Sequence, residues 1–281
     1  INATLGVAWS ASYNAMLHLT DQTIPKNSGC FRPIRVISPA GTIMNVNYPG
    51  SNVGGNTETH PLIVACIFGA MSACAPHRVM ASEGTTHGCF VFGGHDEEND
   101  EPFGAFDFTY VGYGGRQFAD GNDATDSING NCRVIPVEVF ETRYPWFTEK
   151  FSLVPDSGGA GAFRRGLGFH KTLRATTTEI TASQCTARHR IKTWALFGGK
   201  PGGNGATLIQ QAGRDDWRPV AEAGGKVSSS KFSNITLKPG DRVRRSVSGG
   251  GGYGKPEDRE PGRIEEDLRE GYITPEGARR D

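Results

Sequence analysis

The side chains best suited to chemistry lie in a glycine-led polar segment that precedes a long apolar stretch. This segment comprises Gly54, Gly55, Asn56, Thr57 and Glu58. The first N–H groups of a helix lack partners within it, and the helix dipole favours negative charge, so an anion or a developing oxyanion could bind here. Glu58 and Asn56 are candidate catalytic residues, Glu58 as a base, and the other three are candidate substrate- or phosphate-binding residues. The alternative is that Asn56, Thr57 and Thr59 only cap the helix.

A second polar segment combines backbone freedom with positive charge. The stretch 156–161 contains Ser157 and Gly158 and is followed closely by Arg164. Flexible backbone and a guanidinium group can together hold a carboxylate or a phosphate, so these three residues are candidates for substrate or phosphate binding. Turn residues beside surface arginines account equally well for the same pattern.

Four consecutive glycines stand in the stretch 249–254, which ends in Tyr253 and a fifth glycine. Ordering such a run loses much backbone entropy, so the backbone must lie close to a ligand or to another chain segment. Gly250, Gly251 and Tyr253 are therefore candidate substrate- or phosphate-binding residues. A GxxxxGK[ST] phosphate loop is excluded, because Lys255 precedes a proline. The alternative is a tight crossing inside the fold or at a subunit interface.

The acidic, histidine and cysteine residues form no metal-binding pattern, and no metal ligand is predicted. His95 stands beside acids in a segment typical of a solvated loop, and the acids of 120–126 lack the glutamate that closes a calcium loop. The six cysteines contain no CxxC pair. A reduced, cytoplasmic protein with buried thiols is the simplest account of them.

Charge and hydropathy narrow the classes of partner. Thirty basic and 30 acidic side chains give a formal net charge of zero, which predicts no nucleic-acid or membrane partner. The sequence contains no apolar run of about 18 residues and shows no signal peptide. The 39 glycines follow no three-residue period, which excludes collagen and predicts many tight turns.

The elements that must position these residues are predicted from hydrophobic spacing. Helices are expected over 1–20 and 61–75, and the second is apolar all round and therefore buried. Short helices are expected near 264–270 and from residue 275. Strands are expected at 31–37, 42–46, 90–92, 106–111, 134–140, 173–187, 191–197, 207–209, 231–237 and 243–247. The first two strands are expected to form a hairpin.

This order of elements predicts an α+β fold: β-rich mixed or antiparallel sheets with a buried central helix and a short helical C-terminal tail. The chain is interpreted as a β-rich body over 1–248, followed by a glycine loop and helical tail over 249–281. The first residue is Ile1 rather than Met, and it stands in what resembles an element in progress. A processed N-terminus or a split subunit explains this, and so does a truncated chain, which we expect because of the family resemblance described next.

The ordered set of motifs resembles the B-type subunits of ATP-dependent hydantoinases. Related chains are the second half of 5-oxoprolinase and the large subunits of acetone and acetophenone carboxylases. The resemblance covers essentially the whole chain and places it as the C-terminal part of such a subunit. The matching stretches are 24–33, 54–59, 143–145, 156–161, 164–168, 238–241 and 249–256.

The resemblance implies an ATP-dependent hydrolase that acts on carbon–nitrogen bonds in cyclic amides such as hydantoins or 5-oxoproline. It implies that an A-type ATPase subunit or domain binds ATP and Mg²⁺, and that the B-type subunit pairs with it. It also implies a divalent metal held by the front half, which has no counterpart here, so the chain alone is expected to be inactive. The alternatives are an ATP-dependent ketone carboxylase and a non-catalytic scaffold subunit.

Overall fold

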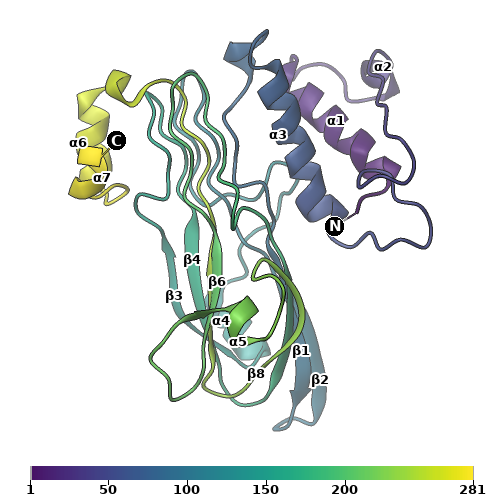
Figure 1. Ribbon diagram of the computed structural model, residues 1–281, viewed down its shortest axis with the longest axis vertical. Coiled ribbons are helices and arrows are strands. Elements are labelled where there is room, and N and C mark those ends of the chain that lie inside the picture. Colours follow the sequence, from purple (N-terminus) through teal and green to yellow (C-terminus); the bar gives the residue numbers. More distant parts are fainter. Residues whose placement is uncertain (1, 281) are drawn as a thin grey trace.

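The computed structural model describes residues 2–280 and consists of a two-sheet sandwich that continues into a layer of long irregular segments (Figure 1). A pair of helices lies on one side of that layer and a helical tail on the other. Both sheets are antiparallel, in the orders β2-β1-β5-β8 and β3-β4-β9-β6-β7. The predicted α+β class, with sheets of antiparallel strands, is confirmed.

The bounds of the strands and short helices define the sandwich. The first sheet contains β1 (Cys89–Asp96), β2 (Glu101–Asp107), β5 (Ile180–Cys185) and β8 (Lys231–Leu237). The second contains β3 (Trp146–Leu153), β4 (Phe169–Ala175), β6 (Ala206–Gln210), β7 (Arg218–Pro219) and β9 (Arg242–Ser246). The short helices are α4 (Val137–Arg143) and α5 (Val220–Ala223).

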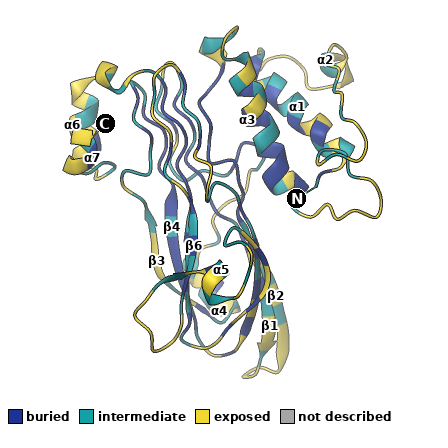
Figure 2. Cartoon of the chain, in the orientation of Figure 1, coloured by how far each residue is buried: buried dark blue, intermediate teal, exposed yellow. Residues whose placement is uncertain are grey.

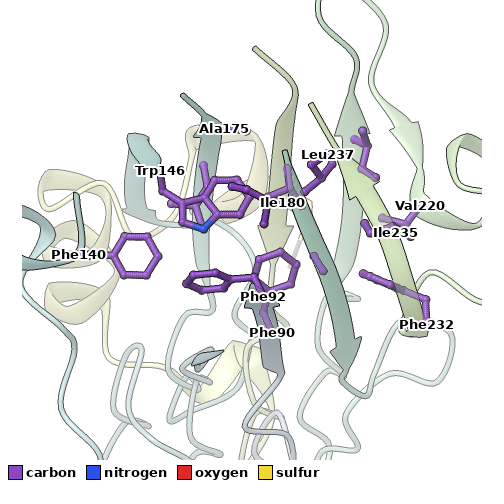
Figure 3. Close-up of a cluster of buried hydrophobic side chains, with 14 residues drawn as sticks. Phe90, Phe92, Phe140, Trp146, Ala175, Ile180, Val220, Phe232, Ile235 and Leu237 are labelled. Carbon is purple, nitrogen blue, oxygen red and sulfur yellow. The ribbon is translucent and has the colours of Figure 1, made fainter. Parts of the chain in front are cut away.

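The core of the sandwich gathers Phe90, Phe92, Phe140 and Trp146 on one side and mostly aliphatic side chains, with Phe232, on the other (Figure 3). Phe92 contacts the rings of Phe140 and Trp146 edge-on, with centroids 5.8 and 5.7 Å apart. Ile235 and Leu237 of β8 face the same interior. Each such side chain contributes about 1.5–3 kcal/mol on burial, so the sandwich supplies a rigid base for the segments above it.

The irregular segments above the sandwich form what we call the glycine layer, defined as residues 81–88, 109–126, 157–168, 193–205 and 247–254. They run side by side (Figure 1) and are largely buried (Figure 2). Backbone hydrogen bonds join them: the Gly251 N–H donates to the Ser82 carbonyl at 2.6 Å, and the Gly115 N–H donates to the Gly251 carbonyl at 2.9 Å. A Cβ atom would overlap a neighbouring backbone carbonyl at Gly112, Gly114, Gly121, Gly166, Gly251 and Gly252. Close approach of backbones therefore explains much of the glycine content.

The helix pair consists of α1 (Leu5–Leu19) and α3 (His60–Met71), the latter preceded by a π-helical turn, η1 (Gly55–Thr59). Buried alanines of α1 and Val64 and Phe68 of α3 belong to one apolar cluster that also contacts the glycine layer. The sequence predicted α3 to be buried all round, but Cys66 and Ala70 are exposed on its other side. The shorter helices of this region are α2 (Ser28–Phe31) and η2 (Pro76–Arg78).

The tail folds into η3 (Pro256–Asp258), α6 (Pro261–Arg269) and α7 (Pro275–Arg280), which confirms the predicted tail helices. The tail lies on the opposite side of the glycine layer from the helix pair (Figure 1). Asp267 of α6 is buried and pairs with Arg164 at 2.9 Å and with Arg259 at 2.7 Å. Residues 249–254, grouped with the tail in the sequence interpretation, lie inside the glycine layer and are hydrogen-bonded to it.

Four predicted strands, two of them in the expected hairpin, are wrong in informative ways. The expected hairpin over 31–46 is absent, with one isolated bridge between Thr42 and Asn45, and no sheet accepts the segment, so Ile37 stays exposed. Residues 137–140 begin α4 rather than a strand, since Pro136 starts a helix whose one buried side chain is Phe140. Residues 191–197 pair only irregularly, within the glycine layer. Local alternation of side chains cannot provide the missing partner strand.

Candidate functional site

A group of ionisable side chains lies buried where the start of α3 meets the glycine layer. We call it the acid–histidine cluster. It draws on η1, on the segment leading into β1, and on the stretch that follows Asp123. Its members are Glu58, Glu83, His87, Asp126 and Asn129.

Glu58 is fully buried and is held by neutral donors. Its Oε2 accepts a hydrogen bond from the Thr86 hydroxyl at 2.6 Å, and its Oε1 accepts one from the Gly88 N–H at 3.2 Å. Within residues 2–280 no lysine or arginine forms an ion pair with it. Burial therefore dominates and raises the pKa of Glu58 to about 8, although the two hydrogen bonds and the charge of His87 oppose the rise.

Glu83 is a second buried acid with the same character. Its Oε1 accepts from the Ser127 hydroxyl at 2.6 Å, and the Ile128 N–H donates to both of its oxygens at 3.2 and 3.1 Å. Burial raises the pKa of Glu83 to about 7, against the effect of these hydrogen bonds. Two carboxyl groups that exchange protons near neutral pH suit general acid–base chemistry.

His87 is held with acceptors at both ring nitrogens. Its Nδ1 lies 2.8 Å from Asp126 Oδ1, and its Nε2 lies 2.9 Å from Asn129 Oδ1. The amide of Asn129 cannot be reversed, because its Nδ2 donates to the Asn56 carbonyl at 2.7 Å. Nε2 of His87 therefore donates to Asn129, and the Asp126 carboxylate beside Nδ1 favours the imidazolium form, although Nδ1 and Asp126 lack hydrogen-bond geometry. Burial by itself lowers the pKa of His87, but Asp126 and Asn129 outweigh it and raise the pKa above its usual value.

His60, the first residue of α3, stays neutral beside this cation. Burial lowers the pKa of His60 to about 4, and the charge of His87 acts in the same direction. Its Nδ1 is buried without a hydrogen-bond partner among the described residues. The start of α3 thus offers a neutral imidazole, two protonatable acids and one fixed cation within a single buried region.

The chemistry of these donors does not suit a resident metal ion. Both oxygens of Glu58 and both of Glu83 are already occupied by hydroxyl or backbone donors. In the part of the chain that the structure describes, no three histidine, cysteine, aspartate or glutamate side chains converge on one point. Nor is any helix among residues 2–280 long and apolar enough to cross a membrane.

Comparison with known proteins assigns the chain to a family. The family model described as "Hydantoinase B/oxoprolinase" matches residues 1–256. The chain belongs to the hydantoinase B/oxoprolinase family.

Relatives in this family extend well beyond the present chain. Caprolactamase subunit beta of Pseudomonas jessenii is 28% identical over 284 residues, covering 99% of this chain and 48% of the relative. 5-Oxoprolinase of Dictyostelium discoideum is 28% identical over 263 residues, covering 90% of this chain and 18% of the relative. The chain therefore spans about half or less of the relatives it matches.

Two solved structures share the fold. The crystal structure of ATP-dependent caprolactamase from Pseudomonas jessenii superimposes with a TM-score of 0.85 at 26% identity, covering 99% of this chain and 48% of that one. A nucleotide-free acetone carboxylase gives a TM-score of 0.83 at 18% identity, covering 99% and 40%. The second likeness concerns the fold alone.

The family motif at 54–59 delivers Glu58 to the acid–histidine cluster. Gly54 has a φ of 80°, which glycine adopts without strain, and Gly55 lies so close to Ala3 that a side chain would collide with it. The Thr57 carbonyl accepts a hydrogen bond from the backbone N–H of His87 at 3.3 Å. The side chain of Asn56 is exposed beside the cluster, whereas its carbonyl is bound by Asn129.

The candidates in the second motif lie on the tail side of the glycine layer, away from Glu58. The Ser157 hydroxyl donates to the Val154 carbonyl at 2.6 Å and accepts from the Gly168 N–H at 3.0 Å. Arg164 bonds Asp123 and Asp267 and stacks on the ring of Tyr272. Ser157 and Arg164 thus have internal partners, and Gly158 packs against the backbone of the layer.

The third motif lies inside the glycine layer. The backbone N–H groups of Gly250 and Gly251 donate hydrogen bonds to carbonyls of neighbouring segments, and a Cβ atom at either glycine would collide with those segments. The Tyr253 hydroxyl donates to the Pro76 carbonyl at 3.2 Å, which ties the layer to η2. These contacts match the tight crossing that the sequence left open as an alternative to a ligand loop.

Sequence reasoning missed most of the cluster around Glu58. Glu83 and His87 stand in a run of small residues, Ala81 to Gly88, that shows neither helical nor strand periodicity. Asp126 was weighed only as part of a calcium pattern. An acid and a histidine set among small residues just before a strand were the available signal.

Proposed function

We propose that this chain is part of an ATP-dependent cyclic amidase that opens hydantoin- or 5-oxoproline-like rings. The observation that carries the proposal is Glu58, a buried acid with a pKa of about 8 in a motif that matches the family. Relatives named caprolactamase and 5-oxoprolinase act on cyclic amides, which supports the reaction class.

The chemistry explains why such an enzyme needs ATP. An unstrained ring amide is a poor electrophile, because its nitrogen donates electron density to the carbonyl. Transfer of a phosphoryl group to the amide oxygen turns that oxygen into a leaving group and makes the carbon open to attack. In the proposal, an A-type partner subunit binds ATP and Mg²⁺, and this chain helps to enclose the ring.

Within that scheme Glu58 is the base. Ionised, it takes a proton from the water that attacks the activated carbon, and the Thr86 hydroxyl and Gly88 N–H keep its oxygens oriented meanwhile. Asn56, whose side chain is exposed beside the cluster, hydrogen-bonds the ring in this proposal. The imidazolium of His87 favours the ionised form of Glu58, as its effect on that pKa shows.

The proposal also covers the cellular compartment of the protein and the position of its divalent metal ion. The protein is proposed to be cytoplasmic, and six free cysteines fit a reducing compartment. The expected burial of these thiols is wrong, because three are exposed and three only partly buried. The divalent metal implied by the family resemblance is assigned to the front half that relatives contain and this chain does not match.

The test is turnover by the complete protein that contains this chain, combined with its A-type subunit. ATP hydrolysis is measured over hydantoins, lactams, 5-oxoproline and ketones, with and without bicarbonate. We expect cyclic amides to stimulate ATP hydrolysis without bicarbonate, and Glu58→Gln to lower kcat at least a hundredfold.

Glu149→Gln is the matched control, because Glu149 bridges Arg174 and Arg242 on the sandwich surface far along the chain from the cluster. It should retain turnover. Stimulation by ketones only with bicarbonate would replace the amidase with a carboxylase. Full activity of Glu58→Gln would leave the chain as a scaffold.

A further inference from the structure

A hollow of about 280 Å³, open to solvent, lies where residues of α1, α3, η2 and the 113–118 stretch meet. Four side chains of its lining can carry positive charge and none is acidic: His18, His77, Arg78 and Arg116. Because like charges gather here without a carboxylate among them, the hollow favours an anion.

Arg116 is fixed by neutral groups, so its charge remains available. Its Nη2 donates to the Asp120 carbonyl at 2.9 Å and to Asn122 Oδ1 at 3.1 Å. The Asp120 carboxylate is instead engaged by Arg259 at 2.9 Å and by Arg263 at 3.5 Å. The Nε of Arg116 is buried without a hydrogen-bond partner among the described residues.

Arg78 likewise has no ion pair among residues 2–280 and is exposed. Arg78 acts electrostatically on Asp21, which is exposed. The pKa of Asp21 is lowered mainly by its hydrogen bonds to Thr23 and only slightly by Arg78. Two guanidinium groups therefore face the hollow without a committed counter-charge.

Rings and aliphatic side chains form the rest of the wall. Phe68, Tyr113 and Phe118 line it, and the Arg116 guanidinium lies 5.7 Å from the centre of the Phe118 ring. Phe118 is 69% exposed, so its ring is open to a ligand in the hollow. A flat apolar body would remove this ring from water while leaving an anionic group beside the arginines.

We propose that this hollow binds a small organic anion, with a flat apolar body against Phe118 and Tyr113 and a carboxylate or phosphate at Arg116 and Arg78. Charge-assisted hydrogen bonds from guanidinium groups favour such a group over a neutral analogue. The site is separate from Glu58 but adjoins its cluster: Ile128 lines the hollow, and its N–H donates to Glu83.

The hollow is held in place by a residue of the glycine layer. Tyr253 donates its hydroxyl to the Pro76 carbonyl, directly before the two basic residues of η2. Tyr253 of the 249–254 stretch thus supports the wall of the hollow without contacting the ligand.

The test is binding of three probes to the complete protein that contains this chain, without its A-type subunit or ATP, by calorimetry at pH 7 and low salt: benzoate, phenyl phosphate and benzamide. We expect at least one anion to bind and the neutral amide to bind at least tenfold more weakly. The tighter anion identifies the preferred group. Arg116→Met and Arg78→Met should each weaken binding about tenfold, a change of about 1.4 kcal/mol.

Arg214→Met is the control, since Arg214 is an exposed arginine that pairs with Asp216 and lies outside the hollow. Circular dichroism confirms folding, and Arg78→Met, at an exposed position, keeps the test valid if Arg116→Met does not fold. Equal binding of benzamide, or unchanged affinity in Arg78→Met, overturns the proposal. Because neither ATP nor a partner is present, a negative result leaves the proposed amidase function untouched.

Discussion

Two buried charged regions flank the glycine layer, and they are built on opposite principles. On the tail side, Arg164 and Arg259 face three carboxylates, and the ion pairs measure 2.7–3.1 Å. On the helix side, Glu58 and Glu83 face hydroxyl and backbone donors. The tail network balances charge with charge, whereas the acid–histidine cluster leaves two acids to titrate near neutral pH.

The difference indicates which region holds structure together and which can perform chemistry. Ionised groups that are paired on every side stay ionised and anchor the elements that carry them. Acids that are buried among neutral donors keep a proton that can be transferred. Arg164, chosen from the sequence for its charge, therefore fits an anchoring role, and Glu58, chosen from its motif, fits a proton-transfer role.

The largest effect should come from breaking the tail network. Asp267→Ala leaves Arg164 and Arg259 buried without their shared partner, and we expect the free energy of unfolding to fall by about 3–5 kcal/mol. Urea denaturation measures it. Glu266→Ala, at the adjacent exposed position, should cost less than about 1 kcal/mol. Equal losses in the two variants would show that the tail is not held by this network.

A smaller effect should appear in the pH dependence of stability. Folded Glu58 keeps its proton up to a pH of about 8, whereas an ordinary glutamate loses it near 4.5. Between these values the folded state binds more protons, so the free energy of unfolding falls as pH rises, by up to about 1.4 kcal/mol per pH unit. Glu83 acts in the same direction up to a pH of about 7.

Glu58→Gln cannot ionise, and its stability should therefore decline less steeply between pH 5 and 8 than that of the unsubstituted chain. Urea denaturation at intervals of one pH unit gives the two slopes, and Glu149→Gln should match the unsubstituted chain. Parallel curves for Glu58→Gln and the unsubstituted chain would mean that Glu58 titrates as an ordinary surface acid.

The smallest effect is spectroscopic and concerns His87. At pH 7 we expect the nitrogen NMR signals of His87 to report protons on both Nδ1 and Nε2, because each faces an acceptor. His170 and His189 serve as internal references, since burial lowers the pKa of each to about 4 and leaves them neutral. A neutral His87 at pH 7 would remove the fixed cation from the cluster.

Much of the secondary structure follows from local sequence. The strands predicted from alternation at 231–237 and 243–247 are confirmed as β8 and β9. The helix predicted from apolar spacing near the start of the chain is confirmed as α1. The proline-led tail helices are confirmed in the same way. In these segments propensity, capping and periodicity agree, so neighbouring residues suffice.

The sequence by itself determined the family motifs, the α+β class and the choice of Glu58 as a candidate, because an acid shortly after a glycine pair and before a helix is a local feature. Only the tertiary structure brought Glu83, His87 and Asp126 to that acid from stretches 25 to 68 residues further along the chain. It also decided that the glycine runs pack against other backbones, and that segment 31–46 finds no partner strand. Burial and pairing are relations between distant segments, and they set both the pKa of Glu58 and the close approach that only glycine permits.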